Sequence, residues 1–145
     1  MPSKERRIRV IMATLGLEPH WRGAVTVASI LRDLGMEVIY ISNAYPEEII
    51  QAAIQEDVDV VGVSTLTGTH LTLGSELLQM AKQKSIKDKI VFIIGGIFPP
   101  HDVPKLHEVG FDGIFGPGAR GEEIYSFIRN AVTAKVNEAR RTSLT

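Results

Sequence analysis

The chain has 145 residues, which is enough for one domain with a buried core; 44% of them are hydrophobic and 23% charged, as in ordinary globular proteins. The formal net charge of −1 gives no indication of a nucleic-acid partner. The absence of cysteine excludes disulfides and thiolate chemistry, and without an apolar run of 18 residues or a signal peptide we expect a cytoplasmic protein with no membrane partner.

Strand and helix patterns alternate five times along the chain. In chain order we predict a strand at 7–14, a helix at 23–34, a strand at 37–42, a helix at 46–56, a strand at 57–64, a helix at 70–84, a strand at 89–94, a helix at 101–109, a strand at 111–115 and a helix at 121–139. Gly35 suits the end of the first helix and Pro46 the start of the second. We expect a flexible leader at 1–6, one domain at 7–139 and a frayed tail at 140–145.

The predicted strands are short and rich in valine and isoleucine, and each is followed by a helix. This pattern indicates a parallel sheet that helices cover on both faces. With right-handed crossovers the result is a doubly wound α/β fold. We expect the flavodoxin-like (Rossmann-like) form, with five strands in the order 2-1-3-4-5.

Unusual residues follow four of the five predicted strands. The segments 15–22, 65–69, 95–100 and 116–121 hold glycines, hydroxyl side chains or a histidine near a carboxylate. Each segment alone is explained by a tight turn, a helix cap or an exposed loop. Since ligands of such folds bind outside the carboxyl ends of the strands, the clustering favours a large ligand that lies across this edge.

Three spaced motifs resemble the signature of cobalamin-binding domains that hold the cofactor base-off with a histidine on cobalt. The motifs are Glu18-x-His20-x-x-Gly23, Ser64-x-Leu66 and Gly95-Gly96, with 40 residues between the first two and 28 between the last two. Further runs, namely Arg22-Gly23, residues 53–60 and Phe115-Gly116-Pro117-Gly118, look like adenosylcobalamin-dependent acyl-CoA mutases. In that family the domain forms the C-terminal part of methylmalonyl-CoA mutase or a separate small subunit, as in 2-hydroxyisobutyryl-CoA mutase. The resemblance covers residues 7–132.

The resemblance implies a role for each motif residue. His20 would be the lower axial ligand of cobalt, and Glu18 would orient its ring by accepting a hydrogen bond from the other ring nitrogen. The nucleotide tail of adenosylcobalamin would enter a slot behind this loop. Residues expected to contact the cofactor are Pro19, Trp21, Arg22, Gly23, Ser64, Leu66, Gly68, Gly95, Gly96, Phe115, Gly116 and Gly118. No catalytic residue is expected on this chain alone, because in the family a large TIM-barrel subunit binds the acyl-CoA. We therefore expect a hetero-oligomer.

Four residues differ from the usual family pattern. Glu18 stands where the family has aspartate, Pro19 where it has glycine, Trp21 where it has aspartate, and Ala119 where many members have threonine. Glutamate keeps the carboxylate one methylene further out, whereas proline removes a backbone N–H.

Several other functions use related folds. A corrinoid carrier for methyl transfer usually has a helical domain first, and only about six residues precede the first strand here. A receiver domain would need a phosphorylatable aspartate where Ser64 ends the third strand, and a flavin carrier would need a hydroxyl-rich loop after the first. A family member that has lost the cofactor remains a further alternative.

Overall fold

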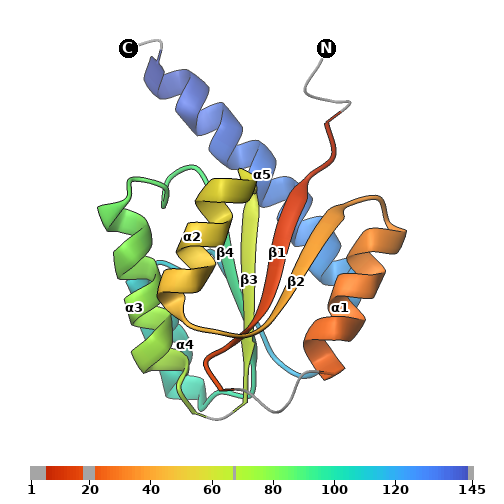
Figure 1. Ribbon diagram of the computed structural model, residues 1–145, viewed down its shortest axis with the longest axis vertical. Helices are drawn as coiled ribbons and strands as arrows, with labels where there is room; N and C mark the ends of the chain where they lie inside the picture. The colour runs from red at the N-terminus through yellow and green to blue at the C-terminus, as the bar shows by residue number, and fades with distance from the viewer. Residues whose placement is uncertain (1–5, 18–21, 67, 144–145) are drawn as a thin grey trace.

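The computed structural model describes residues 6–17, 22–66 and 68–143 (Figure 1). Its elements are β1 (Arg9–Leu15), α1 (Arg22–Asp33), β2 (Glu37–Ala44), α2 (Pro46–Glu56), β3 (Val60–Thr65), α3 (His70–Gln83), β4 (Val91–Gly96), the 3-10 turn η2 (Pro100–Asp102), α4 (Val103–Val109), β5 (Gly113–Phe115) and α5 (Gly121–Ser143). The strands form one five-stranded parallel sheet in the order β2-β1-β3-β4-β5. The predicted fold class is therefore confirmed.

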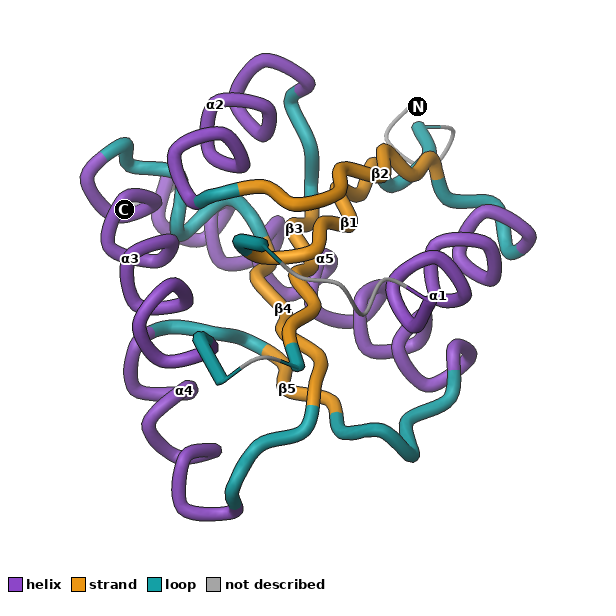
Figure 2. The backbone as a smooth tube through the Cα atoms, turned by 60° about the horizontal axis from the view of Figure 1, so that its bottom comes forward, coloured by secondary structure: helices purple, strands orange, loops and turns teal. Residues whose placement is uncertain are grey.

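Helices cover both faces of the sheet. Figure 2 looks onto the carboxyl ends of the strands, with α1 and α5 on one side of the sheet and α2, α3 and α4 on the other. Each face has its own apolar cluster, because alternate residues of a strand point to opposite faces. In β1, Ile11 and Ala13 belong to the cluster beneath α2, α3 and α4, whereas Val10 and Met12 belong to the cluster beneath α1 and α5.

The third strand begins later than its sequence pattern predicts. The alternation of Asp57, Val58, Asp59 and Val60 is typical of a strand, but Asp57 has the left-handed φ of 52° and ends α2. The N–H of Val58 donates to the carbonyl of Ala53 at 3.2 Å, which closes the helix. The strand itself begins at Val60, although Asp59 already exchanges backbone hydrogen bonds with Arg9 of β1 and Val91 of β4, both at 2.9 Å.

The last helix is longer than predicted, and a lysine on it is hydrogen-bonded to the segment that precedes β4. It extends to Ser143 rather than to residue 139, and residues 122–143 contain neither glycine nor proline that would end it. The Lys135 ammonium donates to the carbonyls of Lys87 at 2.8 Å and Ile90 at 2.7 Å. These carbonyls precede β4, so the contact lies at the amino edge of the sheet. Burial lowers the pKa of Lys135.

None of the helices within the described ranges combines the length and the apolar character that crossing a membrane requires.

Candidate functional site

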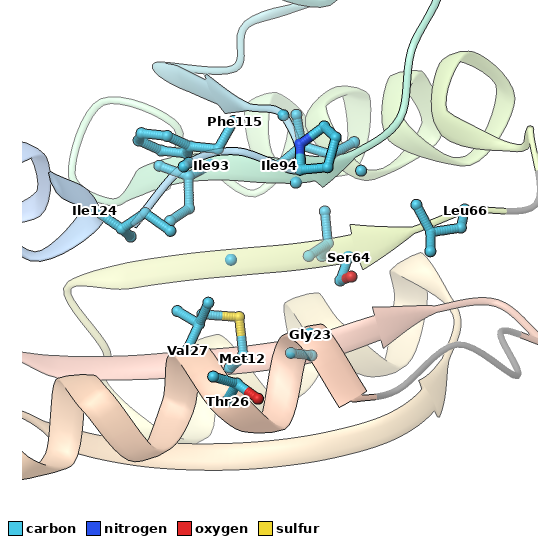
Figure 3. A pocket seen from close by; sticks show the side chains of 18 of the residues that line it. Met12, Gly23, Thr26, Val27, Ser64, Leu66, Ile93, Ile94, Phe115 and Ile124 are labelled. Carbon is cyan, nitrogen blue, oxygen red and sulfur yellow. The ribbon is translucent and has the colours of Figure 1, made fainter. Parts of the chain in front are cut away.

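A cavity of about 790 Å³ lies between α1 and the sheet (Figure 3). The first turns of α1 form one wall, with Gly23, Thr26 and Val27. The sheet forms the opposite wall through Met12, Gly62, Ser64, Ile93 and Gly95. Since Ser64, Leu66, Gly95 and Gly96 come at or just after strand ends, the cavity opens at the carboxyl edge, where ligands of this fold class bind.

The cavity exists because two neighbouring strands carry small residues on the face beneath α1. Strand alternation places Gly62 and Ser64 of β3 on this face, beside Gly95 of β4. A Cβ atom at Gly62 would meet Met12 Cε at 3.1 Å, so that position is already filled by its neighbours. A Cβ at Gly95 would meet nothing closer than the Phe115 carbonyl oxygen at 3.8 Å. The open space therefore depends chiefly on the missing side chain at Gly95.

The cavity is apolar along most of its length and polar near α1 and the end of β3. Figure 3 shows Ile93, Phe115 and Ile124 together at the inner end, away from the strand ends. The polar side chains that line it are Arg22 and Thr26 from α1 and Ser64 from β3. Such a cavity suits an elongated ligand with an apolar end group and a polar remainder.

Eight of the expected cofactor contacts line this cavity. They are Arg22, Gly23, Ser64, Leu66, Gly95, Gly96, Phe115 and Gly116. Gly68 and Gly118, which are described, are not among the lining residues. The expected cobalt ligand His20 and its neighbours Glu18, Pro19 and Trp21 lie outside the described residues. In the remainder of the chain, no group of three or more histidine, aspartate or glutamate residues could hold a metal ion.

Several lining residues were not predicted from the sequence. Met12, Thr26, Val27, Gly62, Ile93 and Ile124 belong to this set. Most of them look like ordinary core positions, since their side chains are apolar and recur at strand or helix spacing. Gly62 did carry a signal, because a glycine inside an apolar strand marks a close approach of another group.

A buried hydrogen-bonded pair on the other face of the sheet was also missed. The ring Nε2–H of His70, the first residue of α3, donates to Asp102 Oδ2 at 2.8 Å. Both residues are only 7% exposed. The hydrogen bond from His70 is the main reason that the pKa of Asp102 lies below its ordinary value of 3.8, so Asp102 is a carboxylate at neutral pH.

The fold and the cavity together define a flavodoxin-like ligand-binding domain. Comparison with known proteins assigns it more closely, since the model of the B12 binding domain family matches residues 8–125. The chain belongs to the B12-binding family, which confirms the resemblance in its motifs.

Relatives in this family are acyl-CoA mutases. The small subunit of 2-hydroxyisobutanoyl-CoA mutase from Aquincola tertiaricarbonis is 40% identical over 88% of this chain and 94% of the relative. Methylmalonyl-CoA mutase from Escherichia coli is 41% identical over 78% of this chain, which corresponds to 16% of that enzyme. The chain is thus homologous to a whole mutase small subunit and to about one sixth of a longer mutase.

Solved structures agree on the fold. A cobalamin-binding protein from Desulfitobacterium hafniense superposes with a TM-score of 0.75 at 18% identity, over 86% of this chain and 59% of that one. A receiver domain from Methanospirillum hungatei superposes with a TM-score of 0.66 at 15% identity, over 92% of this chain and 99% of that one. At such identities the likeness shows a shared fold and no shared function.

Proposed function

We propose that this chain is the cofactor subunit of an adenosylcobalamin-dependent acyl-CoA mutase and binds the cofactor base-off, with His20 as the lower axial ligand of cobalt. The observation that carries the proposal is the open cavity between α1 and the sheet, which contains eight of the expected contact residues. His20 precedes Arg22, a residue of the cavity wall, by two positions in the sequence.

The residues of the cavity fit the nucleotide tail of cobalamin. The tail has an apolar dimethylbenzimidazole at its end, and the inner end of the cavity is lined by Ile93, Phe115 and Ile124. Its ribose and phosphate need polar partners, which Ser64, Thr26 and Arg22 would provide. The volume of about 790 Å³ falls within the usual range for small-molecule sites. A cavity filled by side chains would have argued for a family member that had lost the cofactor.

The chain's own part in the reaction is to bind and orient. Bound adenosylcobalamin supplies radical chemistry through its cobalt–carbon bond. His20 would present a neutral imidazole nitrogen, because a protonated ring cannot bind a metal. Glu18 would accept a hydrogen bond from the other ring nitrogen and so fix the orientation of the imidazole.

A large subunit would complete the enzyme. The chain matches nearly the full length of a protein named as a mutase small subunit, and another relative, from Streptomyces virginiae, is named as the large subunit of methylmalonyl-CoA mutase. We propose that the acyl-CoA site lies on a separate TIM-barrel subunit and that the corrin ring is held between the two proteins.

Binding of hydroxocobalamin tests the proposal. The purified chain should retain the corrinoid through a desalting column and change its visible spectrum, and His20→Ala should lose the spectral change and most of the retention. His107→Gln is the matched control, since His107 is an exposed residue of α4 and does not line the cavity. Equal spectra and equal retention for wild type and His20→Ala would refute ligation by His20.

A further inference from the structure

The buried pair of His70 and Asp102 joins two segments that follow neighbouring strands. His70 begins α3, directly after the segment that leaves β3, and Asp102 ends η2, which follows the segment that leaves β4. The hydrogen bond of 2.8 Å therefore spans 32 residues of sequence. His101 Nε2 and the Lys105 ammonium lie near the other carboxylate oxygen of Asp102, at 3.5 Å and 3.8 Å.

A continuous set of contacts links this pair to the rim of the cavity, which we define as Leu66, Gly96 and Ile97. The ring of Phe98 packs against His70 with 4.8 Å between centroids. The same ring would lie 3.0 Å from a Cβ at Gly96, and that Cβ would also collide with the carbonyl oxygen of Thr65. The segment after β3 and the segment after β4 are thus packed closely, from His70 and Asp102 to the cavity lining.

The rim carries two large apolar side chains that reach solvent. Leu66 is 40% exposed and Ile97 is 64% exposed, and both line the cavity. Since exposed side chains gain little from burial, the backbone segments that carry them contribute much to their position. The buried hydrogen bond from His70 to Asp102 is a strong polar contact between these two segments, because a charged acceptor makes a shorter and stronger hydrogen bond than a neutral one.

We infer that His70 and Asp102 are positioning residues for corrinoid binding: by tying the segment after β3 to the segment after β4, they hold Leu66, Gly96 and Ile97 where the cavity stays open to the cofactor tail. This inference rests on the proposed use of the cavity. Neither residue lines the cavity or touches the cofactor, and both act through Phe98 and the backbone of the rim.

Titration of hydroxocobalamin into wild type, His70→Ala and His70→Gln tests this role. His70→Ala removes the hydrogen-bond donor to Asp102 Oδ2, and the dissociation constant should rise by about 10- to 100-fold, as when outer partners of a site are removed. The amide of His70→Gln can still donate to Asp102, so this variant should recover most of the affinity.

Lys135→Met is the control for a merely structural effect. Lys135 is a second, partly buried tie, but it lies at the amino edge of the sheet and donates to the carbonyls of Lys87 and Ile90. Its loss should lower the unfolding temperature without changing the dissociation constant.

The outcomes separate the inference from the proposed function. The positioning role is supported if His70→Ala loses affinity for hydroxocobalamin and His70→Gln recovers most of it, while Lys135→Met keeps the wild-type affinity. Wild-type affinity in a folded His70→Ala overturns it, whereas failure of the wild type to bind overturns the proposed function as well. If circular dichroism shows that His70→Ala is unfolded, Asp102→Ala decides, because it removes the acceptor of the His70 hydrogen bond. Unchanged affinity in this variant also overturns the inference.

Discussion

Replacing Gly95 by valine would fill the cavity without disturbing the fold. A Cβ at this position meets no atom closer than 3.8 Å, and Gly95 lies in β4, where a β-branched residue is favoured. Removing a strand glycine contributes about 0.5–1 kcal/mol to stability, so the free energy of unfolding of Gly95→Val should equal or exceed that of the wild type.

The same change should weaken cobalamin binding. The valine methyl groups would occupy space that the nucleotide tail needs, and overfilling a packed site costs about 1–3 kcal/mol. Because 1.4 kcal/mol corresponds to a factor of ten, the dissociation constant of hydroxocobalamin should rise by about 5- to 150-fold. Gly95→Ala should give a smaller loss in the same direction.

Spectroscopic titration with two corrinoids measures this effect and locates it. Cobinamide lacks the nucleotide tail, so its affinity should be nearly the same for wild type and Gly95→Val, whereas the affinity for cobalamin should fall. Urea unfolding of both proteins checks that the fold is intact. A stable Gly95→Val protein that binds cobalamin as tightly as the wild type would show that the tail does not enter this cavity.

Three further predictions concern stability and the extent of the site. Gly62→Val should destabilise the fold by about 1–3 kcal/mol in urea unfolding, because its side chain would press on Met12 and Ile93, 3.1–3.2 Å from the new Cβ; unchanged stability would mean that these neighbours move aside freely. Gly118→Val should bind cobalamin within about twofold of wild type, because Gly118 does not line the cavity and its Cβ would meet no atom within 4 Å; a loss as large as that of Gly95→Val would extend the site beyond the cavity. The lowered pKa of Asp102 means that its ionised form stabilises the fold above the ordinary value of 3.8, a contribution lost as pH falls through the folded pKa. The unfolding temperature of wild type should therefore drop more steeply than that of Asp102→Asn from about pH 5 to about pH 2, and parallel curves would contradict this.

Much of the fold could be predicted because its signals are local. Short apolar strands that alternate with helices indicate the parallel sheet, and the order β2-β1-β3-β4-β5 is the one expected of a flavodoxin-like fold with five strands. The predicted start of β3 was wrong, and the reason is local as well. The alternation at Asp57 to Val60 has strand periodicity, yet the left-handed conformation of Asp57 and the bond from Val58 to Ala53 assign the first residues to the end of α2.

The site was only partly visible in the sequence. The glycines and hydroxyls at strand ends indicated the correct edge, and Ser64 and Gly95 do line the cavity there. Val27 follows the apolar spacing of the helix predicted at 23–34, and this spacing does not show that its side chain faces a cavity. The pairing of His70 with Asp102 could not be foreseen, because the two residues are brought together by the packing of α3 against η2 and α4 and share no sequence motif.

The identity of the atom that binds cobalt is the most direct test of the account. The cobalt(II) form of bound cobalamin has one unpaired electron, which couples to the axial nitrogen in electron paramagnetic resonance. Protein labelled with ¹⁵N-histidine should give a two-line nitrogen splitting, because ¹⁵N has spin one half, and His20→Ala should abolish it. A three-line splitting in the labelled protein would show that ¹⁴N of the cofactor's own base remains on cobalt, and would contradict both ligation by His20 and the placement of the tail in the cavity.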